Sequence, residues 1–390
     1  MVLASARKRL MNSLKQLRDC GQSIWLDYIR RDLITSGEFQ RLVEEDGIHG
    51  VTSNPTIFDK AIAAGIAYDD ALRLLLAADP DRDALTLFEK LEIEDLQMAA
   101  DILRPVYDQT KGADGFVSIE VSPRLAYDTA GSVAEAQRLW KAVNRPNLMV
   151  KIPSTVHGVQ AVEVLIAGGI NVNITLMFSL AHYEAVAQAY LRGLKRNAKP
   201  HQVSSVASFF VSRVDTEVDR ALETIGTPEA LSLRGKIAIA NARVVYRRFR
   251  EIFLGTPFEE FRRLGARLQR PLWASTGTKN PAFSDVLYIE KLIGPHTINT
   301  IPPATLNAFR DHGRVQPTLE GGEQDAEQAL ARLAKLGIDL GAITEKLLAD
   351  GITAFTHSLD ELLASLQEKR RVLLESQAAR KNETRSARIA

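Results

Sequence analysis

The chain has 390 residues, of which 45% are hydrophobic, and its 49 basic and 48 acidic side chains leave a formal net charge of +1. This balance gives no overall field that would attract nucleic acid or an anionic membrane, so we expect neither as a partner. The one cysteine, Cys20, excludes an intramolecular disulfide and fits a cytoplasmic protein, and no apolar run approaches the roughly 18–20 residues that span a bilayer.

The stretch from Met1 to Arg18 carries five basic side chains and no acidic one. An amphipathic helix beside the first strand explains this stretch, because Leu10, Leu14 and Leu17 recur at helical spacing. An organelle transit peptide is the alternative, since its composition is similar. We expect the helix.

Short apolar runs then alternate with longer helical patterns, which is typical of βα units in a parallel sheet. We expect eight strands, at Ile24–Ile29, Ile48–Thr52, Gly115–Val121, Leu148–Ile152, Ile170–Thr175, Val203–Phe209, Pro271–Ser275 and Thr297–Ile301. Helical patterns follow, such as Val133–Val143, Gly158–Ile166 and Leu180–Lys195. Eight such units predict an α/β fold, a closed (β/α)8 TIM barrel with additional helices. An open doubly wound sheet is the alternative, but no glycine-rich fingerprint follows the first strand.

Two connections between the expected strands are long. Residues 58–109 contain several helical patterns, including Leu85–Tyr107, and residues 213–269 contain at least two. We interpret both connections as helical excursions on the barrel and not as separate domains.

The C-terminal part of the chain also has helical patterns, at Glu323–Leu336 and Ile343–Leu366. The last stretch is polar and rich in Arg, Ser and Glu, which is typical of disorder. We therefore predict one domain over residues 1–370 and a disordered tail over residues 371–390.

Charged and polar side chains interrupt several of these strands, although parallel barrel strands are buried on both faces. Asp27, Glu120 and Lys151 each lie near the end of a different strand. The fifth strand adds three polar residues at period two, which share one face: Asn171, Asn173 and Thr175. A buried ion-pair network that only stabilises the barrel is one explanation. Three ionisable groups at strand ends favour a catalytic site, because catalytic groups gather there in this fold.

A lysine in an apolar strand has a specific chemical use. Desolvation favours the neutral amine of a buried lysine, and a neutral amine attacks a ketone to form an imine. The protonated imine is an electron sink that lets a neighbouring carbon–carbon bond break or form. Lys151 is thus the candidate nucleophile, Asp27 and Glu120 are the candidate acid–base groups, and Thr175 is placed to orient a water.

Five short motifs, each after a predicted strand and in the same order, resemble those of the transaldolases. They are Thr52–Thr56, Val117–Leu125, Val150–Thr155, Asn173–Ser179 and Ser208–Asp215. The resemblance covers the chain from about Gln22 to about Asn307 and implies a (β/α)8 barrel that needs no cofactor. It also implies the reversible transfer of dihydroxyacetone from sedoheptulose 7-phosphate to glyceraldehyde 3-phosphate. The products would be erythrose 4-phosphate and fructose 6-phosphate, in the non-oxidative pentose phosphate pathway.

The resemblance also implies roles for residues at the matching positions. Lys151 would form the Schiff base, and Glu120 would work through a water held by Thr175. Asp27 would take and return the proton of the hydroxyl next to the cleaved bond.

Other matching positions would bind the substrate. Asn54 and Asn173 would hold the hydroxyls of the dihydroxyacetone unit, and Ser208 would line the same pocket. Arg213 would bind the phosphate, which suits guanidinium geometry.

The seventh strand departs from the family pattern, which often has a second phosphate-binding arginine there. This chain reads Ser275-Thr276-Gly277-Thr278-Lys279 instead. Lys279 is therefore the candidate for the second cation, with Ser275 beside it, although a solvated loop lysine is the alternative. The C-terminal extension is longer than in short family members, and we expect its helices to cover the barrel mouth.

Two other functions are compatible with a barrel of this kind. Fructose 6-phosphate aldolases release free dihydroxyacetone and have a glutamine and a tyrosine where this chain has Glu120 and Phe210, so the transferase is favoured. A catalytically silent binding barrel would lack the nucleophile or the acid–base groups, and none is missing.

Neither a metal nor a defined oligomer is indicated by the sequence. The seven histidines form no ligand-spaced pair, and they are His49, His157, His182, His201, His296, His312 and His357. We expect phosphorylated sugars as the partners and a monomer or a homodimer.

Overall fold

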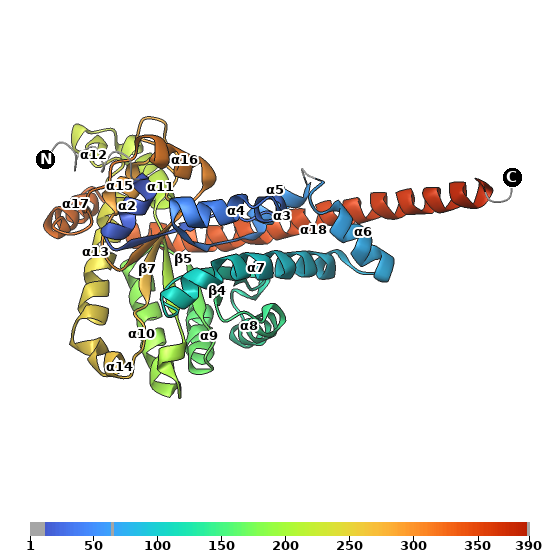
Figure 1. Ribbon diagram of the computed structural model, residues 1–390. Helices are drawn as coiled ribbons and strands as arrows, with labels where there is room; N and C mark the ends of the chain where they lie inside the picture. Colours follow the sequence, from blue (N-terminus) through green and yellow to red (C-terminus); the bar gives the residue numbers. More distant parts are fainter. Residues whose placement is uncertain (1–11, 64–65, 388–390) are drawn as a thin grey trace, which may run out of the picture.

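Eight parallel strands form a closed barrel in the computed structural model, which describes residues 12–63 and 66–387 (Figure 1). The strands are β1 Gln22–Leu26, β2 Ile48–Val51, β3 Phe116–Glu120, β4 Leu148–Pro153, β5 Val172–Met177, β6 Ser205–Phe210, β7 Arg270–Ala274 and β8 Thr297–Ile301. They follow one another in chain order, and β1 pairs with β8 to close the ring. The predicted (β/α)8 barrel is confirmed, and the open doubly wound sheet is wrong.

All eight predicted strands are present; β8 has the predicted bounds, and the other seven have at least one shifted end. The first strand stops at Leu26, so Asp27 lies just beyond it, where the chain turns towards the mouth of the barrel. The fifth strand begins and ends two residues later than predicted, at Val172 and Met177.

Helices surround the barrel and fill the connections between strands. They are α2 Ser13–Asp19, α3 Arg31–Thr35, α4 Glu38–Arg41, α5 Pro55–Ala63, α6 Asp69–Ala78, α7 Ala84–Gln109, α8 Thr129–Val143, α9 Val156–Ala167, α10 Leu180–Arg196, α11 Ser212–Ile225, α12 Pro228–Leu231, α13 Ile237–Phe249, α14 Glu259–Arg263, α15 Leu287–Lys291, α16 Pro303–His312, α17 Glu323–Lys335 and α18 Leu340–Ala387. Side chains cap the N-termini of α8, α9 and α10, at Asp128, Thr155 and Ser179. None of the helices in the described part of the chain is long and apolar enough to cross a membrane.

The expected N-terminal helix is present as α2, where Leu14 and Leu17 are buried beside β1. Leu10 lies outside the described residues. Both long connections are helical, as predicted: the first contains α5, α6 and α7, and the second contains α11 to α14.

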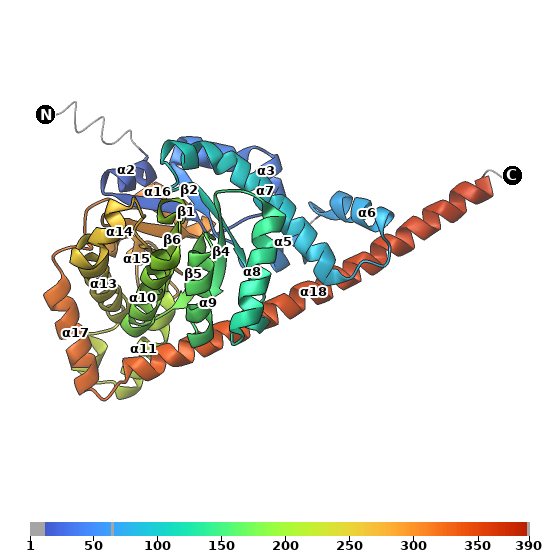
Figure 2. The same cartoon turned by 90° about the horizontal axis from the view of Figure 1, so that it is seen from below.

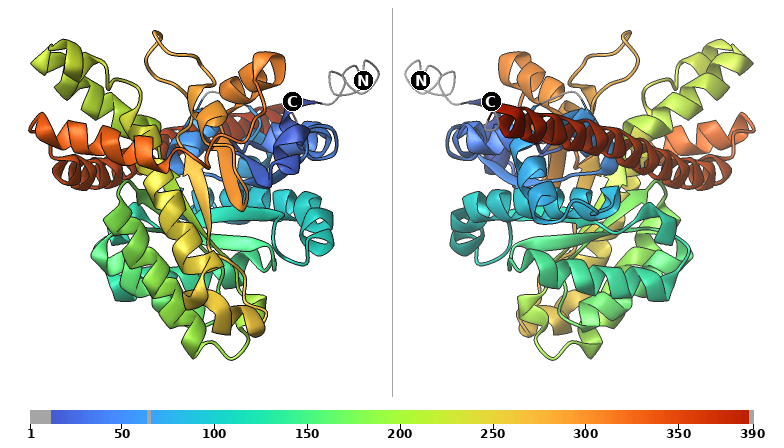
Figure 3. Two further views of the ribbon diagram at one scale, coloured as in Figure 1. Left: turned by 90° about the vertical axis from the view of Figure 1, so that its left-hand side faces the viewer. Right: turned by 90° about the vertical axis from the view of Figure 1, so that its right-hand side faces the viewer.

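Helix α18 crosses the barrel and continues past it (Figures 2 and 3). A stripe at spacings of three and four residues is buried, and it comprises Leu348, Ile352, Phe355, Leu359, Leu362 and Leu366. Gly351 permits a close approach to β5, because a Cβ there would lie 2.9 Å from the Leu176 side chain. The helix therefore lies over the C-terminal ends of the strands, as expected for the C-terminal extension.

The segment 371–387 is helical, which differs from the prediction of a disordered tail. Arg371 pairs with Glu368 and with Glu375, one helical turn away on either side. Such pairs support a solvated helix, and composition alone does not reveal them because they depend on spacing.

Candidate active site

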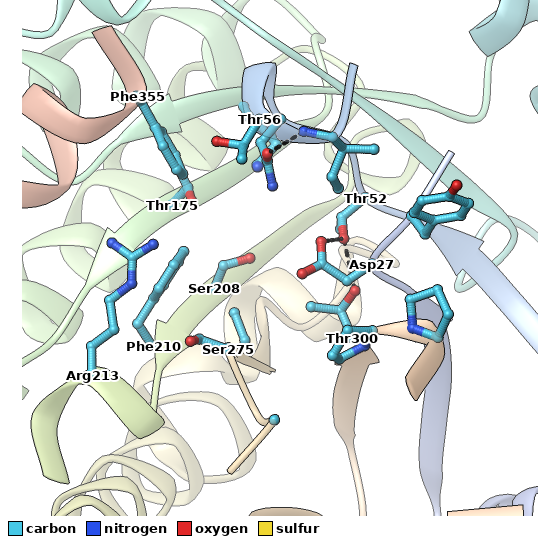
Figure 4. A pocket seen from close by; sticks show the side chains of 18 of the residues that line it. Asp27, Thr52, Thr56, Thr175, Ser208, Phe210, Arg213, Ser275, Thr300 and Phe355 are labelled. Atoms are coloured by element: carbon cyan, nitrogen blue, oxygen red, sulfur yellow. Dashed lines mark hydrogen bonds between the residues drawn. The ribbon is translucent and has the colours of Figure 1, made fainter. Parts of the chain in front are cut away.

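A cavity of about 400 Å³ opens at the C-terminal ends of the strands (Figure 4). Nine residues that the sequence singled out line it together: Asp27, Asn54, Lys151, Thr175, Ser208, Phe210, Arg213, Ser275 and Lys279. Glu120 and Asn173 do not line it, although both contact residues that do.

Lys151 comes from β4 and is only 5% exposed. Its Nζ donates to the carbonyl oxygen of Ser53 at 2.9 Å and lies 3.2 Å from Glu120 Oε2. The register explains the second contact, because Glu120 of β3 pairs directly with Lys151 of β4. The amine is thus held between two acceptors, with its tip at the cavity wall.

Glu120 lies behind Lys151 and not in the open cavity. Burial raises the pKa of the Glu120 carboxyl, and the charge of Lys151 and its hydrogen bond oppose that rise. A carboxyl with a raised pKa, in contact with an amine, can accept a proton and return it.

Asp27 accepts a hydrogen bond from Thr52 Oγ1 at 2.8 Å, and Thr52 Oγ1 lies 2.7 Å from Thr300 Oγ1 (Figure 4). Burial raises the pKa of Asp27, and the Thr52 bond and the nearby charges of Lys151, Lys279 and Arg213 oppose the rise. Asp27 therefore lies in the cavity as a fixed carboxyl that is poised to exchange a proton.

Thr175 has a fully buried side chain whose Oγ1 has no hydrogen-bond partner among the described residues. An unpaired buried hydroxyl is costly, so its position on the cavity wall calls for a ligand or a water. The next residue, Leu176, has a left-handed backbone with φ of 58°, and the β5–β6 register shifts there. Such strain is frequent beside functional sites.

Asn173 is fully buried behind the wall. Its Nδ2 donates to Ser118 Oγ at 3.1 Å, and its Oδ1 accepts from Ser208 Oγ at 2.7 Å. The structure thus assigns Asn173 to holding Ser208, whose side chain lines the cavity. Asn54 caps α5 through its Oδ1, which accepts from Ile57 N at 3.1 Å, and it lines the cavity directly.

The cationic end of the cavity contains Arg213 and Lys279. Arg213 lies over the ring of Phe210, 5.4 Å from its centroid. Burial lowers the pKa of the Arg213 guanidinium, and the charge of Asp27 opposes this. Neither cation has an ion-pair partner within residues 12–63 and 66–387, so both remain available to an anion. Lys279 borders the cavity, but it is an exposed residue of a loop, so its role as the second phosphate-binding cation stays a prediction beside the alternative of a solvated lysine.

Ser275 follows β7 with a left-handed backbone, φ 55°. Its Oγ lies 3.0 Å from Ser212 Oγ, which ties the end of β7 to the start of α11 and thereby positions the neighbouring Arg213.

Several cavity residues were missed from the sequence. Thr52 donates to Asp27 and contacts Thr300, and a signal existed for both threonines, because they are polar residues at strand ends. The place of Phe355 in the cavity could not be predicted, because this residue lies in α18, far along the chain, and its position in the sequence is that of an ordinary apolar residue of a helix. No cluster of three or more metal-ligating side chains occurs in the described ranges.

Comparison with known proteins decides the family. A family model described as Transaldolase/Fructose-6-phosphate aldolase matches residues 24–366. The chain belongs to this family. A curated relative named Transaldolase from Thiobacillus denitrificans is 48% identical over 91% of this chain and 100% of its own length. Relatives of the same name come from Thermobifida fusca, 48% identical over 90% of this chain and 96% of their own, and from Mycobacterium ulcerans, 45% identical over 91% and 96%. The predicted membership in the transaldolase family of transferases is confirmed.

Proposed function

We propose that the chain transfers a dihydroxyacetone unit between phosphorylated sugars through a Schiff base on Lys151. The reaction is the reversible exchange of sedoheptulose 7-phosphate and glyceraldehyde 3-phosphate for erythrose 4-phosphate and fructose 6-phosphate. The observation that carries the proposal is the contact between Lys151 and Glu120 at the wall of a cavity that also contains Asp27 and Thr175.

Imine formation begins with a proton transfer. Glu120 takes a proton from the ammonium group of Lys151, which lies 3.2 Å away. The neutral amine then attacks the ketone carbon of the donor, and the carbinolamine loses water to give the imine. The unpaired hydroxyl of Thr175 holds the water through which Glu120 acts on this carbon.

Carbon–carbon cleavage then requires a base at the hydroxyl next to the bond. Asp27 removes that proton, the aldose phosphate leaves, and the electron pair is stored in the imine as an enamine. The raised pKa of Asp27 favours return of the proton when the acceptor aldehyde is attacked. Hydrolysis of the second imine repeats the first steps in reverse.

The remaining residues position the substrate. Asn54 and Ser208 hold the hydroxyls of the dihydroxyacetone unit, with Asn173 fixing the Ser208 hydroxyl. Arg213 and Lys279 bind the phosphate, the first through its planar fork and the second as a flexible point charge.

A lyase that releases free dihydroxyacetone is the second candidate, since the family includes such aldolases by name. Glu120 and Phe210 favour the transferase, because aldolases of this kind have glutamine and tyrosine at these positions. Turnover of fructose 6-phosphate should therefore depend on an aldose phosphate acceptor. Rapid release of dihydroxyacetone without acceptor would overturn the transferase and leave the Schiff base intact.

The setting of the enzyme follows from its reaction. Sugar phosphates dissolve in the cytoplasm, where we place the chain, as a monomer or a homodimer. Size-exclusion chromatography with light scattering distinguishes these two states.

A further inference from the structure

A second cavity, of about 530 Å³, lies at the opposite end of the barrel from the active site. Its wall contains Gly21 before β1, Ala113 before β3, Arg270 at the start of β7 and His296 before β8. In Figure 2, α2 and α14 lie on this side of the barrel, and α18 runs along the other. The volume lies within the range of small-molecule sites, roughly 300–1,000 Å³.

The floor of this cavity is apolar. Phe116, Met149 and Val206 come from strands β3, β4 and β6, and Leu254 and Phe258 come from the connection between α13 and α14. Leu254 lines the cavity and is 39% exposed, so its side chain is accessible to a ligand. A floor of this kind binds aromatic or aliphatic groups and disfavours the hydroxyls of a sugar.

The rim of the cavity is cationic. Arg262, Arg267 and Arg270 line it, and no acidic residue does. Arg270 lies 3.4 Å from Asp114 Oδ1, so that its charge is offset.

The other two arginines bind only neutral acceptors among the described residues. Arg267 donates to the carbonyl oxygen of Lys111 at 2.8 Å and to Ser204 Oγ at 3.2 Å. Arg262 donates to the carbonyl oxygen of Phe253 at 2.8 Å. Two guanidinium charges therefore stand over the apolar floor without a carboxylate partner, and this arrangement is complementary to an anion.

We propose that this cavity binds an organic anion with an aromatic body, whose carboxylate, sulfonate or phosphate group pairs with Arg262 and Arg267 while the ring packs against Leu254. The site is separate from the catalytic one. Met149 precedes Lys151 by two residues on β4, so the floor lies about 7 Å below the catalytic layer along the strand. Occupation of this cavity requires no contact with Arg213 or Lys279.

The probe for this site is 8-anilino-1-naphthalenesulfonate, an aromatic monoanion that fluoresces when it is bound. Wild-type protein should bind it at one site, and saturating fructose 6-phosphate should not displace it. Arg262→Gln should weaken binding roughly tenfold, the size of one charge-assisted hydrogen bond. Arg267→Gln should do the same, but the exposed Arg262 is the safer variant because Arg267 also holds the loop at Lys111.

The matched control is Arg263→Gln, because Arg263 neighbours Arg262, pairs with Glu259 and does not line the cavity. Its affinity for the probe should equal that of the wild type. The neutral N-phenyl-1-naphthylamine has the same rings without the sulfonate, so it should bind to the wild type about tenfold more weakly than the sulfonate does. Its affinity for the Arg262→Gln variant should equal its affinity for the wild type.

Three results would overturn the proposal. Arg262→Gln and Arg267→Gln could both bind the sulfonate as the wild type does, or fructose 6-phosphate could displace it. A crystal structure with the probe bound elsewhere would have the same force. None of these results would contradict the Schiff-base chemistry, because that chemistry depends only on the active-site residues.

Discussion

Replacement of Thr175 by valine should disable the enzyme without destabilising its fold. The Thr175 side chain is fully buried and its Oγ1 has no partner among the described residues. Valine has the same shape, and no hydrogen bond to another described residue is lost in the exchange. We therefore expect the free energy of unfolding of Thr175→Val to lie within about 1 kcal/mol of the wild-type value. If the hydroxyl orients the catalytic water, kcat should fall about 100-fold, the lower end of general acid–base effects.

Thr155→Val provides the matched control, since Thr155 is also buried but fully bonded. Its Oγ1 donates to the carbonyl oxygen of Ala126 at 2.5 Å and accepts from Gly158 N at 2.9 Å as the cap of α9. Loss of this cap should cost about 0.5–2 kcal/mol, and kcat should stay near the wild-type value. Urea unfolding and a coupled assay with fructose 6-phosphate and erythrose 4-phosphate measure both quantities. A Thr175→Val protein that is as destabilised as Thr155→Val, or that retains kcat within twofold, would refute the role given to Thr175.

Four other substitutions test the rest of the site. Arg213→Gln should raise KM for fructose 6-phosphate roughly 10- to 100-fold, and Lys279→Gln should raise it less; an unchanged KM in Arg213→Gln would remove that residue from phosphate binding. Glu120→Gln keeps the shape of the side chain but removes the proton acceptor, so the rate of imine trapping should fall about 100-fold. Trapping at the wild-type rate would contradict the acid–base role of Glu120. Burial raises the pKa of Asp27, so the carboxylate base is lost at a higher pH than for an exposed aspartate; kcat/KM should fall as the pH falls through that raised value, and an acid limb at the ordinary aspartate pKa would contradict this. Phe355→Ala enlarges the cavity under α18 and should shift the kcat/KM ratio towards the longer ketose, sedoheptulose 7-phosphate; an unchanged ratio would make Phe355 a packing residue only.

The strands and the catalytic centre were predictable from the sequence for one physical reason. A parallel barrel strand is apolar throughout, so Glu120 and Lys151 stood out against their neighbours. The eight βα units then predicted a closed barrel, in which the C-terminal ends of the strands lie together whatever the structure of the loops.

The indirect contacts were not predictable in the same way. The alternation of side chains along the strand predicted that Asn173 points inward. It did not predict that the Asn173 amide forms hydrogen bonds with Ser118 and Ser208. The left-handed backbone conformations of Leu176 and Ser275 could not be predicted from the sequence either, because leucine and serine rarely adopt this conformation.

The long-range contribution of α18 was predictable only in outline. The sequence predicted that the C-terminal helices cover the barrel mouth, but not which of their residues enter the cavity. Placement of Phe355 in the cavity depends on the close approach at Gly351 and on the hydrogen bond between Thr56 and Ser358 at 2.8 Å. Both contacts join segments far apart in the chain, and Thr56 and Ser358 are separated by 302 positions.

Trapping of the imine tests the chemistry at Lys151 most directly. Borohydride added together with fructose 6-phosphate should reduce the Schiff base to a stable secondary amine, and peptide mass spectrometry should find the added mass on Lys151. Lys151→Arg should show no adduct. An adduct on another lysine, or none on the wild-type protein under turnover, would contradict a Schiff base at Lys151.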